Sequence, residues 1–300
     1  MFVTYVTTWN YPGPLAIIQD MISKSVLNKN SLVLLAFASF NFSSTDYIPG
    51  FGDTTLDDVK NIVTLIHSIN AKIGLSIGGA TYKFYNSNLY DNPSLLASNI
   101  NMIVKSCGFD AVDFDIEDSY SSVPNDFAIQ SASLINTLRG LNNNLIISYT
   151  CPAQAWAIGM YQQQLINLTI QSLTYWAPME YDLWIDSSLN YYEQIQYDIN
   201  FYTNTWGINP NKIILGLMPG EDDISHDLTL QDALNLTSFS LNKGLFGVMT
   251  WDINIDSDGI DGNSPYSYSM GIQTILNKNS KSLIKYNRIK WNIPKRAKLL

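Results

Sequence analysis

The sequence predicts an α/β protein, a single-domain (β/α)8 barrel of the TIM type, and three observations support this prediction. Eight short runs rich in β-branched and aromatic residues recur at intervals of about 30 to 40 residues, the length of one βα unit. Amphipathic helical patterns lie between these runs. Eight such units would occupy about 275 of the 300 residues, as a barrel of this kind requires.

The predicted elements follow one another in a regular order. The predicted strands are residues 2–7, 32–40, 72–77, 111–117, 145–150, 175–181, 212–217 and 245–251. Thr55 is the predicted N-cap of the helix after the second strand, because two aspartates stand in the first turn after it. Asn92 is the predicted N-cap of the helix after the third strand, with Pro93 at the first helical position.

An open doubly wound sheet is the alternative fold. Such sheets usually have fewer strands and a Gly-rich phosphate turn, and the sequence contains no GxGxxG or Walker motif. The sequence is 46% hydrophobic and 14% charged, which is typical of an ordinary globular protein and excludes wholesale disorder. No apolar run reaches the length of about 18 residues that a membrane helix needs. A net charge of −9 argues against a nucleic-acid-binding protein.

The cysteine and histidine content excludes several kinds of site. Two cysteines, Cys107 and Cys151, form neither a disulfide framework nor a zinc cluster. They should lie at opposite ends of neighbouring strands, so we expect two free thiols. Two histidines, His67 and His226, disfavour a histidine-ligated metal site or a histidine-based triad.

The charge is distributed unevenly along the chain. Residues 278–300 hold eight of the 17 basic residues and no acidic residue. Residues 1–277 therefore contain nine basic and 26 acidic residues, a net charge of −17. We expect the last helix of the barrel to end near Asn277, so that residues 1–277 form the barrel and residues 278–300 a separate basic tail. Docking of this tail on the acidic body is the preferred hypothesis, ahead of binding to an anionic surface or leading into a further segment.

The fourth predicted strand carries three carboxylates on one face. Successive side chains of a strand point to opposite faces, so Asp113, Asp115 and Glu117 share one face. The apolar residues between them must pack outward against the helices, which turns the acids into the barrel. Like charges about 6.5–7 Å apart raise each other's pKa, so at least one acid should hold a proton near neutral pH. Glu117 lies at the C-terminal rim, where barrel active sites are built, whereas Asp110 faces the other way.

Buried ion pairs or a bound metal ion would also account for three acids inside a barrel. Pairing with buried Lys or Arg is disfavoured, because residues 1–277 contain only nine basic residues and most fall on predicted helices or loops. A divalent metal site is the stronger alternative, since carboxylates suit Mg²⁺ or Ca²⁺. A glycosidase-like site with a proton-donating acid is the preferred interpretation, with no metal and no cofactor.

The acidic segment resembles the D-G-x-x-D-x-D-x-E motif of glycoside hydrolase family 18, the chitinases and endo-β-N-acetylglucosaminidases. It spans Asp110 to Glu117, with Ala111 in place of the usual glycine. Three more segments resemble family motifs in the family's order and spacing: Ser76–Gly79 for S-x-G-G, Met179–Asp182 for M-x-Y-D, and Gly247–Trp251 for the motif that ends in the tryptophan beneath the sugar. The resemblance runs from residue 3 to residue 275.

The resemblance implies hydrolysis of β-1,4 bonds next to N-acetylglucosamine with retention and without a carboxylate nucleophile. It implies that Glu117 is the general acid that protonates the leaving oxygen, while the acetamido oxygen of the substrate attacks C1 to give an oxazolinium intermediate. Asp115 would accept the acetamido N–H, and Asp113 would share a proton with Asp115. Tyr181 would hold the acetamido oxygen.

The resemblance and the aromatic content together suggest the residues that bind substrate. Sugar rings present apolar C–H faces, for which exposed aromatic rings after strand ends are flat partners. For Ser76, close packing of the third strand is the favoured alternative explanation, and for Met179 it is packing in the core. Trp251 and Tyr181 could instead fill the barrel. The candidate substrate-binding residues are Trp251, Asp182, Met179, Tyr5, Ser76, Trp9, Trp156 and Trp184.

The sequence leaves both the mode of action and the substrate open. Some family members carry an α+β insertion between strands seven and eight that walls a deep groove, but residues 217–245 leave room only for a loop and a helix. We therefore expect an endo-acting chitinase that acts on chitin or chito-oligosaccharides. An endo-β-N-acetylglucosaminidase that acts on N-glycans is the first alternative, and a non-catalytic chitinase-like lectin is the second.

Expectations about partners and location are limited. The expected partner is a polysaccharide or glycan that contains N-acetylglucosamine, with no nucleic acid and no membrane-spanning segment, and the protein is expected to be a monomer. The family implies an extracellular location. The first residues predict a strand rather than a signal peptide, so either this export route is not used or a leader precedes the chain.

Overall fold

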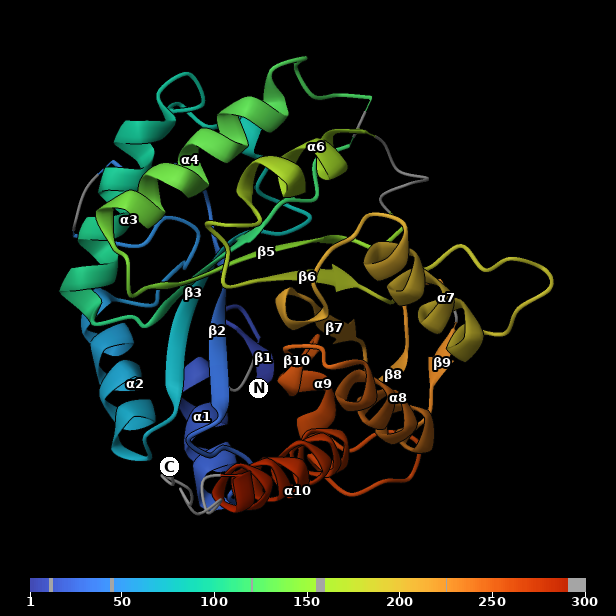
Figure 1. Cartoon of the computed structure of the whole chain (residues 1–300). Helices are drawn as coiled ribbons and strands as arrows, with labels where there is room; N and C mark the ends of the chain where they lie inside the picture. The colour runs from blue at the N-terminus through green and yellow to red at the C-terminus, as the bar shows by residue number, and fades with distance from the viewer. Residues whose placement is uncertain (11–12, 44–45, 120, 155–159, 225, 291–300) are drawn as a thin grey trace, which may run out of the picture.

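Eight parallel strands form a closed barrel in the computed structural model, which describes residues 1–10, 13–43, 46–119, 121–154, 160–224 and 226–290 (Figure 1). Residue 160 and residues 279–290 are described by their backbone alone. The strands are β1 (Phe2–Thr7), β2 (Ser31–Ala38), β3 (Lys72–Gly78), β4 (Ala111–Asp115), β5 (Ile146–Pro152), β6 (Tyr175–Met179), β7 (Ile214–Leu217) and β10 (Gly247–Thr250). The barrel order is β1-β10-β7-β6-β5-β4-β3-β2, which confirms the predicted (β/α)8 fold.

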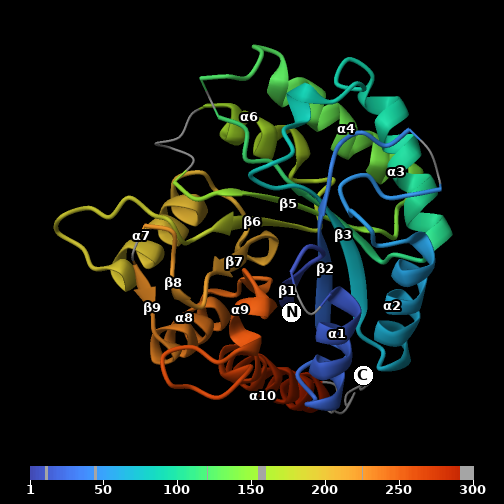
Figure 2. The same ribbon diagram turned by 180° about the vertical axis from the view of Figure 1, so that it is seen from behind.

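Helices surround the ring of strands on its outside, as the front and back views show (Figures 1 and 2). They are α1 (Pro14–Ser23), α2 (Leu56–Ser68), α3 (Pro93–Cys107), α4 (Phe127–Leu141), α6 (Met160–Thr169), α7 (Tyr191–Asn204), α8 (Leu230–Lys243), α9 (Ile253–Ser257) and α10 (Ser267–Lys290). The predicted start signals are confirmed: Thr55 forms a capping box with Asp58, and the Asn92 side chain accepts from the N–H of Leu95. None of the described helices is long and apolar enough to cross a membrane.

Successive side chains along each strand point alternately out of and into the barrel, which produces two apolar layers. Outward-facing residues such as Val33, Ile73 and Val112 are buried against the helices. Inward-facing residues such as Tyr5, Leu34 and Met249 fill the barrel. A barrel closed by helices on its outside and side chains on its inside leaves its ends as the places for a site.

The connection between β7 and β10 is short, as predicted. Its described residues form a small antiparallel pair, β8 (Gly220–Glu221) and β9 (Asp227–Leu228), followed by α8. No α+β domain is inserted among the described residues of this connection. The pair β8–β9 was not predicted, because strands of two residues leave no periodic signal.

Four strands, β2, β4, β6 and β10, end one or two residues earlier than predicted. β4 ends at Asp115 rather than at residue 117, and β6 ends at Met179 rather than at residue 181. The N–H of Ile116 still donates to the Thr150 carbonyl at 3.0 Å, and no ladder bond follows it in the described contacts. Glu117 and Tyr181 therefore lie on loops just past the barrel rim.

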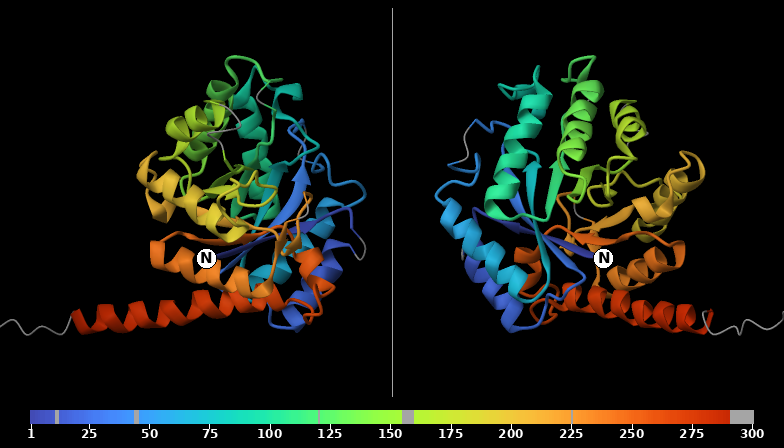
Figure 3. Two further views of the ribbon diagram at one scale, coloured as in Figure 1. Left: turned by 90° about the vertical axis from the view of Figure 1, so that its right-hand side faces the viewer. Right: turned by 60° about the vertical axis from the view of Figure 1, so that its left-hand side comes forward.

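The last helix is longer than predicted. α10 does not end near Asn277 but continues to Lys290, because neither Gly nor Pro occurs between Gly271 and Pro294. Figure 3 shows α10 running along the outside of the barrel and past its edge. The separation of a barrel domain, residues 1–277, from a basic tail, residues 278–300, stays a prediction.

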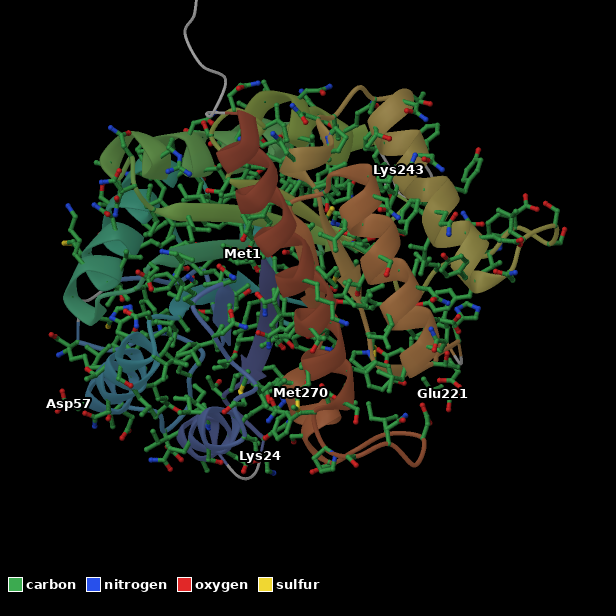
Figure 4. All side chains as sticks on the ribbon, turned by 60° about the horizontal axis from the view of Figure 1, so that its bottom comes forward. Met1, Lys24, Asp57, Glu221, Lys243 and Met270 are labelled. Carbon is green, nitrogen blue, oxygen red and sulfur yellow. The ribbon has the colours of Figure 1, made fainter. Side chains whose placement is uncertain are left out.

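The N-terminal end of the barrel is tied together at Met1. Its ammonium group donates to the Phe246 carbonyl at 3.0 Å, so β1 begins beside β10. Figure 4 labels Met1 near the middle of its view, and Lys24 and Asp57 at the edge of the molecule. Asp110 also lies at this end, where its carboxylate accepts the Ile73 N–H and contacts His67, in agreement with its predicted exclusion from the site.

Candidate active site

The alternation predicted for the acidic segment is present in the structure. The apolar residues Val112, Phe114 and Ile116 lie in the outer layer beneath the helices. Asp113 and Asp115 are buried inside the barrel, and Glu117 is half-buried at its C-terminal rim. Three carboxylates therefore rise in a row from the interior of the barrel to its mouth.

Asp113 is held by four hydroxyl groups from three other strands, the adjacent β3 and β5 and the more distant β1. Tyr5 on β1 and Ser76 on β3 donate to its Oδ2 at 2.9 and 2.8 Å. Ser148 and Thr150 on β5 donate to its Oδ1 at 2.7 and 2.8 Å. Each of the two carboxylate oxygens thus accepts two hydrogen bonds, an arrangement that suits the ionised form.

The strand register explains why these hydroxyls meet. Asp113 is opposite Ser76 on one side and Ser148 on the other. Burial raises the pKa of Asp113 above its usual value, and the four hydroxyl donors work in the opposite direction. The described hydrogen bonds of Asp113 come from these hydroxyls, and none of them joins it to Asp115. Tyr5 and Ser76 are almost fully buried and contact Asp113 directly.

Asp115 lies in a different environment from Asp113. Burial raises its pKa well above the usual value, and the neighbouring charges of Glu117 and Asp113 raise it further. Its Oδ1 is buried and has no hydrogen-bond partner among the described residues. A buried carboxylate oxygen without a donor favours a protonated group or a ligand that brings its own donor.

Glu117 also has a raised pKa. Burial is the largest cause, and the carboxylates of Asp182 and Asp118 add to it, whereas Lys83 lowers it. A raised pKa at the rim favours the protonated form of a carboxyl group that is still in contact with solvent, as a general acid requires.

Tyr181 and Asp182 approach these acids from the loop after β6. Tyr181 is 7% exposed, and burial raises the pKa of its phenol, with the charges of Asp115 and Glu117 adding to the rise. Asp182 is exposed and has a φ of +53°. Asp222 fixes it by accepting its backbone N–H at 2.8 Å, and the carboxylate of Asp182 accepts the N–H of Asp223 at 2.8 Å.

A row of aromatic rings extends outward from the acids. Trp251 stacks on Phe37 with centroids 5.3 Å apart, and Phe37 stacks on Trp9 at 5.9 Å. Tyr5 contacts the edge of Trp251 at 5.4 Å. Trp9 is 58% exposed and lines a cavity of about 650 Å³ between α1 and α2. The rings thus connect the site to a hollow in the surface.

The other candidates lie at different depths. Met179 is buried in the cluster that fills the barrel. Trp184 is 68% exposed, and its backbone is held by the amide side chain of Gln154, through bonds of 2.6 and 3.0 Å. Trp156 lies outside the described residues. Both Cys107 and Cys151 are free and buried, as predicted.

Three residues near Glu117 were not identified from the sequence. Lys83 donates to the backbone carbonyl of Glu117 at 2.8 Å, and Tyr161 donates to that of Asp118 at 2.7 Å. Asp118 is almost fully buried, and burial raises its pKa to about 6. Only the scarcity of basic residues in the body could have drawn attention to Lys83.

The described residues contain no group of three or more His, Cys, Asp or Glu side chains arranged to hold a metal ion. The row of Asp113, Asp115 and Glu117 is spread along β4 and the residues that follow it, so the three side chains do not surround a common point. The arrangement provides a buried carboxyl group held by four hydroxyls, a second buried carboxyl group with an acceptor oxygen that has no partner among the described residues, and a third carboxyl group at the rim.

The sequence and the fold were compared with known proteins. The model of the family described as glycosyl hydrolases family 18 matches residues 1–223. A family 18 chitinase from Pseudoalteromonas aurantia is 21% identical, with a TM-score of 0.71 over 92% of this chain and 98% of that chain. The catalytic domain of a hyperthermophilic chitinase from Pyrococcus furiosus is 15% identical, with a TM-score of 0.70 over 92% and 94%.

A further structure with the same fold is that of human YKL-39, described as a pseudo-chitinase with retained chitooligosaccharide binding. It is 14% identical, with a TM-score of 0.68 over 92% of this chain and 99% of that chain. A search of curated proteins gives no match. At these identities the solved structures establish only the fold. The match to the family model is what shows that the chain belongs to the family.

Proposed function

Because the chain belongs to glycosyl hydrolases family 18, we propose that it is an active chitinase that cleaves β-1,4 bonds of N-acetylglucosamine polymers by substrate-assisted catalysis. The observation that carries this proposal is the row of Asp113, Asp115 and Glu117. Its outermost member has a raised pKa at the rim, and its middle member offers a buried oxygen with no partner among the described residues.

Glu117 is the general acid in this proposal. A raised pKa keeps its proton available near neutral pH, so it can protonate the glycosidic oxygen as the bond to C1 breaks. The acetamido oxygen of the substrate then attacks C1 in place of an enzyme nucleophile. The Glu117 carboxylate left behind activates the water that opens the oxazolinium intermediate and regains its proton.

Asp115 orients the acetamido group. Its Oδ1 lacks a donor in the described structure, and the acetamido N–H of the substrate supplies one. A charged carboxylate in this position stabilises the positive charge of the intermediate. Tyr181 holds the acetamido oxygen from the opposite loop, with Asp182 beside it, and Asp113 keeps the base of the row anionic.

The aromatic row supports a sugar polymer as the substrate. Trp251 forms the floor beneath the reacting sugar, and Trp9 continues the apolar surface outward through Phe37. Trp184, on the side of the β6 loop, is a further subsite candidate because it is exposed. The short connection between β7 and β10 leaves the cleft without an added wall, which supports endo-acting cleavage.

Product analysis tests this function. Wild type and Glu117→Gln would be compared on chitin, on chito-oligosaccharides and on a high-mannose glycoprotein. Release of short chito-oligosaccharides, initially as the β-anomer by proton NMR, is the expected result, and it should depend on Glu117. Deglycosylation alone would instead identify an endo-β-N-acetylglucosaminidase. Binding without turnover would identify a lectin, and activity unchanged in Glu117→Gln would refute the mechanism.

A further inference from the structure

Glu117 lies just past the end of β4, where the hydrogen bonds of the barrel sheet no longer hold its backbone. β4 ends at Asp115, and the last ladder bond joins Ile116 to Thr150. A general acid must hold its proton within hydrogen-bond reach of the leaving oxygen, so its backbone needs other anchors. Those anchors are two side-chain donors from outside the strand.

The two donors bind consecutive backbone carbonyls. Lys83 Nζ donates to the carbonyl of Glu117 at 2.8 Å, from the connection between β3 and α3. The Tyr161 hydroxyl donates to the carbonyl of Asp118 at 2.7 Å, from α6. Glu117 is therefore held from two sides by residues that are 34 and 43 positions away in sequence from the carbonyls they bind.

One aromatic cluster carries both donors. Phe84, the neighbour of Lys83 in the short 3-10 helix Phe84–Asn86, is buried and packs on Phe127 at 5.9 Å. Tyr161 contacts the same Phe127 ring edge-on at 4.9 Å. Such packing restricts the rotamers and the backbone of both donors, which fixes the distance between them.

Lys83 also contributes a charge. Asp115, Glu117 and Asp118 each feel its positive charge, which lowers their pKa values. Within the described part of the chain no other cation has this effect on these three groups. The backbone N–H groups of Phe84 and Tyr85 also lower the pKa of Asp118, although neither of its oxygens has a hydrogen bond of good geometry.

We propose that Lys83 is a positioning residue for Glu117, which both holds its backbone and sets the pH range over which the acid works. Tyr161 shares the first task and not the second. This inference rests on the proposed glycosidase function. The titratable and charged groups that face Glu117 come from four elements: Asp115 and Asp118 on its own segment, Lys83 after β3, Asp182 and Tyr181 after β6, and Tyr161 on α6.

Four variants separate the two tasks. Lys83→Met removes the donor and the charge, Lys83→Arg keeps both, and Tyr161→Phe removes only a donor. Lys60→Met is the matched control, because Lys60 is an exposed lysine on α2 that pairs with Asp57. For each, kcat/KM on a chito-oligosaccharide would be measured across pH.

Lys83→Met should lower the maximum and displace the whole pH profile to higher pH, because the pKa values of Asp115 and Glu117 rise together. Tyr161→Phe should lower the maximum without displacement. The pH profiles of Lys83→Arg and Lys60→Met should have their maxima at the same pH as the wild-type profile. A Lys83→Met profile that falls uniformly, without displacement, would overturn the proposal, and so would displacement in Lys60→Met.

A titration that needs no activity keeps this test separate from the proposed function. Carboxyl carbon NMR would follow Glu117 with pH, assigned by comparison with Glu117→Gln. Its pKa should be higher in Lys83→Met than in wild type, and an unchanged value would overturn the proposal even in an inactive protein. If Lys83→Met fails to fold, Lys83→Gln gives the same comparison with the charge removed and a polar side chain retained.

Discussion

Asp113 and Glu117 lie on one face of the same segment, yet the protein holds them in opposite ways. Asp113 is fully buried, and four hydroxyl groups bind its carboxylate. Glu117 is half-buried, and the groups that fix it, Lys83 and Tyr161, bind backbone carbonyls rather than its side chain.

The difference separates a structural charge from a reactive one. A carboxylate with four donors gains stability from its environment and has no free acceptor for substrate. A carboxyl group fixed through its backbone keeps its oxygens available for proton transfer. Asp115, between them, is buried like Asp113 but lacks a partner on Oδ1 among the described residues. From the interior to the rim, the carboxyl groups of the row accept fewer hydrogen bonds from the protein, so their oxygens are more available to a substrate.

The largest expected effect is on activity, at the rim. Glu117→Gln should lower kcat/KM by about 10²- to 10⁴-fold, the range that general acid catalysis supplies. The free energy of unfolding should not fall, because burial disfavours the charge of Glu117 and the side chain carries no described hydrogen bond that glutamine would lose. Glu221→Gln, at an exposed glutamate on β8 (Figure 4), is the control and should change neither quantity.

The next effect is on stability, in the interior. Asp113→Leu leaves the hydroxyls of Ser76 and Ser148 without their acceptor, whereas Tyr5 and Thr150, 3.1 Å apart, can still bond each other. At about 1–3 kcal/mol for each unsatisfied hydroxyl, a loss of about 2–6 kcal/mol is expected in urea unfolding. If Glu117→Gln proved more destabilising than Asp113→Leu, the contrast between the two acids would be reversed.

A smaller effect comes from Asp118 and depends on pH. Burial raises its pKa to about 6 in the folded protein. The folded state therefore binds the Asp118 proton more tightly than the unfolded state. The stability that this proton contributes to the folded state is fully present below about pH 4 and is lost as pH rises through 6. Asp118→Asn should gain stability relative to wild type between pH 4 and 7, by roughly 2–3 kcal/mol.

Asp58 provides a control of opposite sign. The Thr55 hydroxyl and backbone N–H lower its pKa, so its contribution is present at neutral pH and is lost as pH falls. Asp58→Asn should therefore be destabilised relative to wild type at pH 7, with the difference shrinking towards low pH. Parallel slopes for Asp118→Asn and Asp58→Asn would show that burial does not govern Asp118.

The barrel and the acidic row were predictable because both depend on periodicity. Alternation along residues 111–117 assigned Asp113, Asp115 and Glu117 to the inner face, although the strand itself ends at Asp115. Spacing of the apolar runs predicted all eight strands of the barrel. The end of α10 was not predictable from charge composition, because a basic helix without Gly or Pro simply continues to Lys290.

The supporting residues were not predictable in the same way. Lys83 and Tyr161 reach the backbone near Glu117 from separate connections, and their placement depends on how the aromatic cluster around Phe127 packs. The four hydroxyls around Asp113 depend on the register of three strands. Neither packing nor register leaves a local signal in one sequence.

The smallest effects test whether the four hydroxyls act together. Ser76→Ala and Ser148→Ala remove donors to different oxygens of Asp113, and each should cost about 1.5 kcal/mol of unfolding free energy. Each should also raise the pKa of Asp113, since both hydroxyls lower it.

A double-mutant cycle completes this test. Once one donor is gone, the remaining hydroxyls carry more of the stabilisation of the charge, so the double variant should cost more than the sum of the two single variants. Thr64→Ala is a matched control, because the described hydrogen bond of its hydroxyl is to the Lys60 carbonyl on the exposed face of α2. Its effect should add independently to that of either variant. Strict additivity between Ser76 and Ser148 would mean that Asp113 is held by separate bonds. The contrast with Glu117 would then rest on burial and on the number of these bonds, not on cooperation among them.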